Sequence, residues 1–377
     1  MLIGIPTETT PRETRVAATP ETVKKLLATG HQVRVQSGAG ISASVIDEAY
    51  VAAGAIIVDR AVAFGCDLVV KVRSPSLDEL ALMKRGTALV GMLDPFDADG
   101  VARLANAGVI AFALESAPRT TRAQSMDVLS SQANIAGYKA VLIAADHYQR
   151  FFPMLMTAAG TVKAARVVVL GVGVAGLQAI ATAKRLGAVI EASDVRPSVK
   201  EQVESLGGKF IEVPYETDEE RHAAEGVGGY ARPMPQSWLD RQQAEVAKRI
   251  AQADIVITTA LVPGRAAPLL VTEAMVRSMK PGSVIVDLAA GRGAVDEITG
   301  FAAGNCALTE PGRIVVKHGV TLVGETNLAA LVAADASALY ARNVLDFVKL
   351  ITGDGGSLTV PMDDDIVAAC LVTGDAR

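Results

Sequence analysis

Short apolar runs alternate with longer amphipathic stretches along the whole chain. Apolar runs bounded by turn residues are typical of strands buried on both faces of a parallel sheet, and the stretches between them are typical of covering helices. The first array predicts strands at Leu2–Ile5, Gln32–Gln36, Ala55–Val58, Asp67–Val72, Ala88–Leu93 and Val109–Leu114. The second array predicts strands at Arg166–Leu170, Val189–Ser193, Lys209–Val213, Asp254–Thr259, Ser283–Leu288 and Val320–Val323. The predicted fold class is therefore α/β, with two Rossmann-like, doubly wound parallel-sheet domains.

Helix ends can be recognised between these strands. Thr19 can cap a helix that starts at Pro20, and Gly30 can end it, because glycine adopts the left-handed conformation at least cost. Asn134–Arg150 is typical of one long helix that bridges two domains. The last apolar helix, Ala336–Leu350, is predicted to return to the first domain. The predicted domains are residues 1–133 plus 326–377, and residues 134–325, joined by long helices.

One segment departs from the alternation. From Pro214 to Gln243 the chain turns polar, with acidic residues near its start and several glycines in its middle. A long polar loop inside a compact domain is usually a lid or an insertion. We therefore predict a long functional loop here.

Composition raises the question of a membrane span and then disfavours one. The 377 residues are 50% hydrophobic, and the mean hydropathy is +0.32. The longest uncharged run, Val167–Ala183, is shorter than the roughly 20 apolar residues that a spanning helix needs, and glycines interrupt it. The first residues lack the pattern of a signal peptide. Cys66, Cys306 and Cys370 match no disulfide or metal motif, which favours a reducing compartment.

Charge excludes another class of function. The net charge is −5, and the lysines and arginines are spread through the chain. Nucleic-acid binding requires a concentrated basic surface, so we expect no nucleic-acid partner.

A glycine-rich turn carries the clearest chemical signal. The predicted strand Arg166–Leu170 is followed by Gly171, Gly173 and Gly176 and then by a helix-like stretch. In dinucleotide-binding turns the first glycine permits the tight turn, the second lets the backbone approach a pyrophosphate, and the third allows close helix packing. The amino terminus of the helix then offers N–H groups and a positive dipole end to the phosphates.

An acid at the end of the next strand indicates which dinucleotide binds. Asp194 lies roughly 20 residues beyond the turn, where a carboxylate can accept hydrogen bonds from the adenosine ribose hydroxyls. The same carboxylate repels the 2′-phosphate of NADP(H), so NAD(H) is favoured. Arg196 could offset that charge, but we expect it to start the next helix as a solvated residue.

A second polar cluster lies between the two arrays. The segment from Arg119 to Gln132 combines cations, amides, hydroxyls and an acid. This set of donors and acceptors could orient a nicotinamide carboxamide and ribose from the opposite side of a cleft. The alternative is a polar connector whose side chains cap the following helix.

Groups for acid–base catalysis are sparse. His31, His147, His222 and His318 stand alone, and neither a metal-ligand spacing nor a nucleophile elbow is present in the sequence. The sequence therefore predicts nucleotide binding without an evident proton-transfer group.

Several runs resemble one known family over essentially the whole chain. They are Arg122–Gln132, Met156–Thr161, Gly171–Gly187, Lys200–Phe210, Thr258–Gly264, Met279–Ala289 and Val332–Ser337. In these runs the chain resembles the NAD(H)-binding component, domain I, of the proton-translocating nicotinamide nucleotide transhydrogenases. Arg-Ala-Gln-Ser-Met-Asp, starting at Arg122, is the most specific of the matching motifs.

The resemblance implies a Si-specific direct hydride transfer from NADH on this chain to NADP⁺ on a partner domain III, coupled to proton passage through a membrane domain II. It implies that Arg119, Gln124, Asp127 and Ser130 position the dihydronicotinamide. A mobile loop carries Tyr230, which closes on the nucleotide. Transfer between two nicotinamide rings needs positioning and no protein acid or base. The implied NAD(H)-binding residues are Gly171, Gly173, Val174, Ala175, Gly176, Asp194, Val195, Arg196, Gly229, Tyr230, Thr259, Ala260 and Leu261.

The resemblance also bears on assembly and location. Family members are homodimers, and the membrane parts would belong to other polypeptides. We therefore expect a cytoplasmic protein, peripheral on the inner face of the cell membrane through its partner subunits. Relative to the family pattern, residues 291–302 form an insertion that follows a predicted strand.

Two alternatives remain. The alanine dehydrogenases share the two-domain plan, and Arg15 and Lys71 match their substrate-binding positions. However, Asp94 stands where they have a histidine, and their catalytic acid aligns near Gly291. Loss of a general base typically costs about 10²–10⁴-fold in rate, which disfavours alanine chemistry. The other alternative is a non-catalytic NAD(H) sensor.

Overall fold

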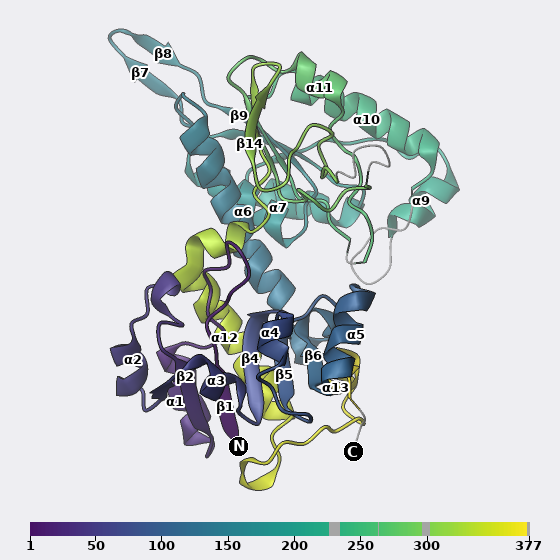
Figure 1. The fold of residues 1–377 in the computed structure, drawn as a ribbon. Coiled ribbons are helices and arrows are strands. Elements are labelled where there is room, and N and C mark those ends of the chain that lie inside the picture. Colours follow the sequence, from purple (N-terminus) through teal and green to yellow (C-terminus); the bar gives the residue numbers. More distant parts are fainter. Residues whose placement is uncertain (226–233, 263, 296–301, 375–377) are drawn as a thin grey trace. The chain divides into compact units, whose positions relative to one another are not determined.

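The computed structural model describes residues 1–225, 234–262, 264–295 and 302–374, and the chain forms two compact units (Figure 1). Unit 1 comprises Met1–Gln132 and Ala329–Arg377, and unit 2 comprises Ala133–Leu328. Helix α6 (Val128–His147) carries the chain from unit 1 into unit 2. Unit 1 is thus assembled from two separate stretches of sequence, whereas unit 2 is continuous.

Unit 1 is built on a seven-stranded sheet in the spatial order β16-β6-β5-β4-β1-β2-β3. Six of these strands are parallel, which confirms the first predicted array: β1 (Leu2–Ile5), β2 (Gln32–Gln36), β3 (Ile56–Val58), β4 (Leu68–Arg73), β5 (Ala88–Met92) and β6 (Ile110–Ala113). The seventh, β16 (Leu371–Thr373), pairs antiparallel with β6 at one edge. The sequence did not predict β16, because three residues are too few to show a strand pattern.

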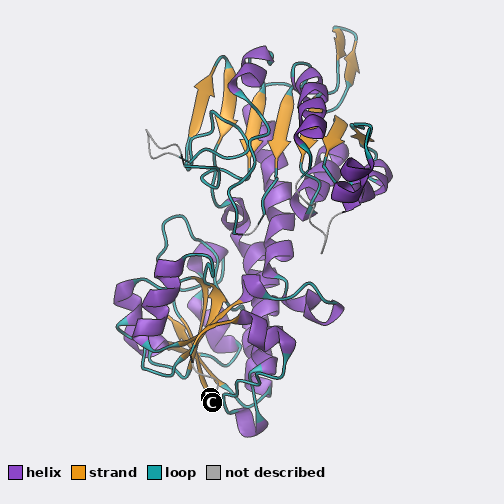
Figure 2. Ribbon diagram, turned by 90° about the vertical axis from the view of Figure 1, so that its right-hand side faces the viewer, coloured by secondary structure: helices purple, strands orange, loops and turns teal. Residues whose placement is uncertain are grey.

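The helices of unit 1 cover this sheet (Figure 2). Thr19 is the N-cap of α1, Pro20 is its first residue, and Gly30 follows its end with φ at 85°, which confirms the predicted helix ends. The helices are α1 (Pro20–Ala28), α2 (Asp47–Ala52), α3 (Arg60–Phe64), α4 (Leu77–Leu80), α5 (Ala98–Ala107), α12 (Ala333–Leu350) and α13 (Asp365–Cys370).

Helix α12 lies in the core of unit 1 and explains much of the apolar composition. Tyr340 and Phe347 are fully buried, and the Phe347 ring lies 5.4 Å from that of Phe112 on β6. Within the described residues, the segment Leu328–Leu350 is the one helix long and apolar enough to cross a membrane, and 56% of its most apolar window is buried inside the protein. Its apolar face is therefore used in the core of unit 1.

Unit 2 is built on a second seven-stranded sheet, in the order β11-β10-β9-β12-β13-β15-β14. Alternate residues of its central strands belong to two separate hydrophobic clusters, so both faces of the sheet are buried. The parallel strands are β9 (Arg166–Leu170), β10 (Val189–Ser193), β11 (Lys209–Phe210), β12 (Ile255–Thr258), β13 (Val284–Asp287) and β15 (Val320–Val323). The edge strand β14 (Ile314–Lys317) is antiparallel to β15 and was not predicted.

Three sequence-based predictions for unit 2 were wrong in detail. The polar segment from Pro214 to Gln243 is not one long loop, because it contains α9 (Asp218–Glu225) and most of α10 (Gln236–Ile250). The helix predicted to start at Asn134 starts six residues earlier. A two-stranded hairpin, β7 (Leu155–Thr157) and β8 (Gly160–Val162), was not predicted. The remaining helices are α7 (Val174–Arg185), α8 (Lys200–Ser205) and α11 (Glu273–Ser278).

Candidate functional site

The order of strands in unit 2 defines a topological switch point. From β9 the chain continues outward to β10 and β11, and it then returns to build the other half of the sheet from β12. In such sheets ligands bind at the carboxyl ends of the strands next to the switch point. Gly171 directly follows β9, Asp194 follows β10, and Thr259 follows β12, so these predicted residues lie at this edge.

The three glycines of the turn meet different surroundings. Gly171 has φ at 90°, and a Cβ there would lie 2.9 Å from the Thr259 Oγ1. A Cβ on Gly176 would lie 2.0 Å from the Gly171 carbonyl oxygen. A Cβ on Gly173 would meet no atom within 4 Å. Packing therefore requires glycine at positions 171 and 176, whereas open space borders Gly173, as the approach of a phosphate to the backbone would require.

Helix α7 begins at this turn. Gly173 is its N-cap, and Val174 and Ala175 are its first residues. The first N–H groups of an α-helix have no acceptor inside the helix, and the dipole adds partial positive charge there. The turn therefore offers the donors and the open backbone that a pyrophosphate needs.

Asp194 is held by four hydrogen bonds. The backbone N–H of Val172 donates to its Oδ2 at 2.7 Å, and the backbone N–H of Arg196 donates to its Oδ1 at 2.9 Å. The Arg196 Nε donates to Oδ1 and the Arg196 Nη2 donates to Oδ2, both at 2.9 Å. Arg196 is thus not the solvated residue that we expected, because its guanidinium forms a two-pronged ion pair with Asp194.

Val195, between them, turns toward a small apolar cluster. It packs against the group that contains Val213, Met234 and Trp238. The Tyr215 ring stacks on Trp238, with centroids 5.8 Å apart. Burial, and secondarily the Asp194 charge, raise the pKa of Tyr215. The predicted residues Gly229 and Tyr230 lie outside the described residues.

The segment after β12 is fixed by side chains from other strands. The Thr259 Oγ1 donates to the Gly171 carbonyl at 2.8 Å, which ties the two predicted turns together. The Asn305 carboxamide accepts from the Ala260 N–H at 3.0 Å and donates to the Ala260 carbonyl at 2.9 Å. Both backbone groups of Ala260 are therefore occupied, while the side chain of Leu261 is exposed.

Asp287 and Asn305 are residues that the sequence analysis missed. Both are fully buried. The Asp287 carboxylate accepts hydrogen bonds from five donors: the hydroxyls of Thr258 and Thr309 and the N–H groups of Ala289, Asn305 and Cys306. Asp287 thus holds Asn305, and Asn305 holds the segment at Ala260. The acid at the carboxyl end of a buried strand was the signal that could have identified them.

The predicted nicotinamide loop lies in unit 1. Arg119 and Gln124 are exposed, and Gln124 lies in a 3₁₀ helix, Thr121–Met126. The Asp127 Oδ1 accepts from the Ser130 N–H at 2.8 Å, and its Oδ2 accepts from the Ser130 hydroxyl at 2.6 Å. Asp127 therefore caps α6, and Ser130 lies in the first turn of that helix.

Two contacts anchor this loop within unit 1. Arg122 donates to both carboxylate oxygens of Asp364 at 2.6 and 2.9 Å, and this pairing lowers the pKa of Asp364 to about 2. The Asn343 side chain donates to the Ser125 carbonyl at 2.7 Å and accepts from the Ser131 hydroxyl at 2.7 Å. The loop is thus attached to α12 and to the N-cap of α13.

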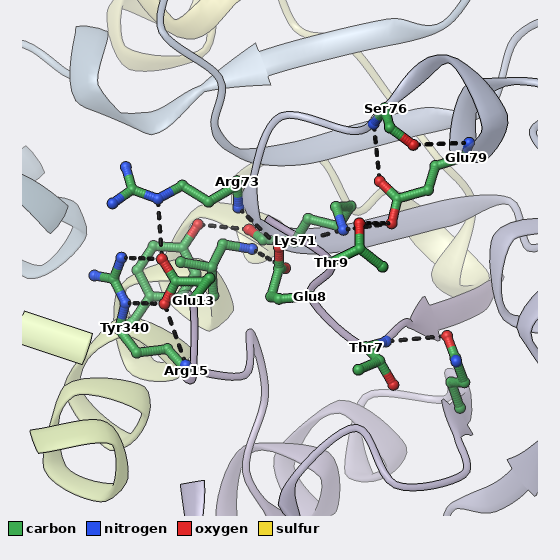
Figure 3. A network of polar contacts seen from close by, with 12 residues as sticks. Thr7, Glu8, Thr9, Glu13, Arg15, Lys71, Arg73, Ser76, Glu79 and Tyr340 are labelled. Atoms are coloured by element: carbon green, nitrogen blue, oxygen red, sulfur yellow. Dashed lines mark hydrogen bonds and ion pairs between the residues drawn. The ribbon is translucent and has the colours of Figure 1, made fainter. Parts of the chain in front are cut away.

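Arg15 and Lys71 belong to a buried ionic network at the switch point of unit 1 (Figure 3). Arg15 is 2% exposed, and its Nε and Nη2 donate to Glu13 at 2.7 and 2.6 Å. The Lys71 ammonium lies 3.3 Å from Glu8 and 3.4 Å from Glu79. Both cations are therefore neutralised by carboxylates of their own unit.

Other chemistry finds little support at these positions. Asp94 has φ at 54°, and its N–H donates to Glu115 at 2.7 Å. Within the described residues, no group of three or more His, Cys, Asp or Glu could hold a metal ion. Two surface pockets, of about 470 and 510 Å³, are lined by residues other than the predicted ones. The candidate site therefore rests on the switch-point residues themselves.

A doubly wound sheet with a glycine turn at its switch point and an acid after the next strand defines the class of dinucleotide-binding α/β proteins. The family models described as Alanine dehydrogenase/PNT, N-terminal domain and C-terminal domain, match residues 4–136 and 140–377. The chain therefore belongs to the alanine dehydrogenase/PNT family, which confirms the resemblance and the predicted fold class.

Individual relatives fall into two groups. Over 384 residues the chain is 51% identical to the first of the separately encoded pieces of NAD(P) transhydrogenase subunit alpha from Rhodospirillum rubrum, covering 100% of this chain and 97% of the relative. A transhydrogenase structure from Sinorhizobium meliloti superposes with a TM-score of 0.88 at 46% identity, covering 99% of both chains. An L-alanine dehydrogenase structure superposes with a TM-score of 0.79 at 26% identity, covering 98% of this chain and 94% of the other.

Proposed function

We propose that this chain is the NAD(H)-binding subunit of a proton-translocating NAD(P) transhydrogenase. The observation that carries the proposal is the full-length similarity to the Rhodospirillum rubrum transhydrogenase alpha polypeptide, at 51% identity. The switch-point site of unit 2 is compatible with it, because glycine turn, helix terminus and acid occur together. In the proposed reaction, hydride passes directly and Si-specifically from NADH on this chain to NADP⁺ on a partner subunit.

Each group of residues has a proposed role. Gly171, Gly173 and Gly176, with the first N–H groups of α7, bind the pyrophosphate, and Asp194 accepts hydrogen bonds from the adenosine ribose. Thr259, Ala260 and Leu261 line the site through a backbone that Asn305 holds in place. Arg119, Gln124, Asp127 and Ser130 orient the dihydronicotinamide, which supplies the hydride. Orientation is sufficient, because ring-to-ring transfer moves no proton to the protein.

The proposed partners follow from the same resemblance. NADP(H) binds to a domain III subunit, and a domain II subunit in the membrane couples hydride transfer to proton movement. The chain itself is proposed to form a homodimer and to lie on the cytoplasmic side of the membrane, attached through these partners.

An alanine dehydrogenase activity is the second candidate, favoured by the shared family and by Arg15 and Lys71. Against it stand two observations. Both cations are already paired with buried carboxylates, and Asp94 occupies the position of the family's histidine. A substrate carboxylate would have to displace those pairs, and no proton acceptor is supplied by Asp94 in the expected role.

Reconstitution tests the proposal. The purified chain is mixed with membranes that contain the transhydrogenase partner subunits, and reduction of an NADP⁺ analogue by NADH is followed. We expect activity that depends on this chain, and a loss of about 10²-fold or more in the rate for Gln124→Ala, since misplacement of reacting groups costs that much. Asn106→Ala, on the exposed side of α5, is the control and should retain the full rate. NADH formation from alanine by the chain alone, without transhydrogenation, would overturn the proposal.

A further inference from the structure

The ion pair between Asp194 and Arg196 supports an inference that rests on the proposed binding of a dinucleotide by unit 2. Asp194 is the acid expected to bind the adenosine ribose. In this structure its carboxylate already has four donors, of which two are backbone N–H groups and two belong to the Arg196 guanidinium. A ligand hydroxyl can reach this carboxylate only by replacing one of these donors.

The two kinds of donor differ in their freedom to leave. The backbone donors, Val172 and Arg196, are fixed by the glycine turn and by the chain itself. The guanidinium is at the end of a flexible side chain that is 22% exposed, whereas the Asp194 side chain is 7% exposed. Its further bond, from Nη2 to the Val172 carbonyl, is 3.2 Å long. The guanidinium is therefore the exchangeable partner.

The chemistry of the exchangeable group identifies a second ligand. A guanidinium presents parallel N–H groups that bind phosphate oxygens in pairs. In dinucleotide-binding sheets, an arginine near this position accommodates the 2′-phosphate of NADP(H), whereas an acid selects the ribose 2′-hydroxyl of NAD(H). Here both residues are present two positions apart, and the acid holds the arginine.

We propose that the Asp194–Arg196 pair is a masked 2′-phosphate site. Asp194 enforces selectivity for NAD(H) in two ways, by repelling the 2′-phosphate and by occupying the guanidinium that would otherwise bind it. Loss of the Asp194 charge releases Arg196 and creates a site for NADP(H) from residues that the chain already contains. Selectivity is thus a property of the pair and not of the acid alone.

Binding titrations with the full chain test this inference. Dissociation constants for NADH and NADPH are measured by the fluorescence of the bound nucleotide for wild type, Asp194→Asn, Arg196→Ala and the double variant. We expect Asp194→Asn to bind NADPH at least about tenfold more tightly than wild type, since a charge-assisted hydrogen bond is worth that factor. The double variant should lose this gain, and adenosine 2′,5′-bisphosphate should show the same order of affinities.

Glu273→Gln is the matched control, because it removes one negative charge from another ion pair of unit 2. It should leave the ratio of NADPH to NADH affinity unchanged. The inference is overturned if Asp194→Asn gains no affinity for NADPH while wild type binds NADH, or if the double variant keeps the gain. Asp194→Ser gives the same comparison if the asparagine variant does not fold. Failure of wild type to bind either dinucleotide would instead overturn the proposed function, and this inference with it.

Discussion

Two glycines in the same turn face opposite steric conditions, and this separates binding from folding. We predict that Gly176→Ala destabilises the protein by about 1–3 kcal/mol, because its Cβ would overlap the Gly171 carbonyl oxygen. We predict that Gly173→Ala keeps the stability of wild type, because its Cβ meets open space and its φ is −82°. If the pyrophosphate lies against Gly173, the same methyl group should weaken NADH binding about tenfold or more.

Urea unfolding and NADH titration of both variants check this pair of expectations, with wild type as the reference. A Gly173→Ala protein that unfolds like wild type and binds NADH equally well would show that the phosphates do not approach this residue. A stable Gly176→Ala protein would contradict the packing seen in the turn.

At this scale, residues whose role depends on their local backbone could be predicted, and residues whose role depends on a distant partner could not. The glycine spacing identifies the turn, because each glycine answers a requirement within a few residues. Arg196 was interpreted wrongly, because sequence does not show that its guanidinium folds back onto Asp194. Asn305 was missed, because its partner Ala260 lies 45 residues away.

Among the elements, the segment after β12 is held by one side chain to an unusual degree. Asn305 makes three side-chain hydrogen bonds, to both backbone groups of Ala260 and, at 2.8 Å, to the Pro268 carbonyl. We predict that Asn305→Ala lowers the free energy of unfolding by about 2 kcal/mol, because backbone groups lose their partners. It should also weaken NADH binding, because the segment that lines the proposed site is no longer fixed.

Chemical denaturation and NADH titration measure the two effects. Asn106→Ala again serves as the control, since that asparagine is exposed on α5. An Asn305→Ala protein with the affinity of wild type would mean that the 259–261 segment does not contribute to the site.

The central parallel strands could be predicted because each is a continuous apolar run. The antiparallel edges, β14 and β16, escaped prediction because they are short and only partly buried. Helix α9 escaped because three acidic residues crowd its first turn, and a segment of this polarity is typical of a loop. Helix α10 buries Trp238, Val246 and Ile250 along an otherwise polar sequence, a pattern too sparse to stand out.

For the molecule as a whole, the three thiols report separately on the two units. All three are buried and unpaired: Cys66 and Cys370 in unit 1, and Cys306 in unit 2. Burial raises the pKa of Cys306 to about 11 and that of Cys370 to about 12, and it also raises that of Cys66. At pH 8 we therefore expect protonated thiols that do not react with Ellman's reagent in the native protein, and three reactive thiols in urea.

The sign of the pH dependence follows from the same pKa values. Each folded-state pKa lies above that of the unfolded chain, near 9, so the thiols impose no cost on folding below pH 9. Above pH 9 the unfolded chain loses protons that the folded protein retains, and stability should fall as the pH rises toward 11 and 12. Unfolding in urea at pH 8 and pH 10 measures this loss. Rapid labelling of any thiol at pH 8 in the native state would contradict the burial described above.

Unit 1 takes helix α12 and strand β16 from the sequence after residue 329, whereas unit 2 is one continuous stretch. On the ribosome, every residue of unit 2 has therefore been synthesised before the core of unit 1 can close. At ordinary rates of synthesis the residues from 329 to 377 take roughly 2–10 s, and for that time the first array of strands waits without its central helix. Domains usually fold in the order in which they are made, but in this chain the later unit is the first that can finish.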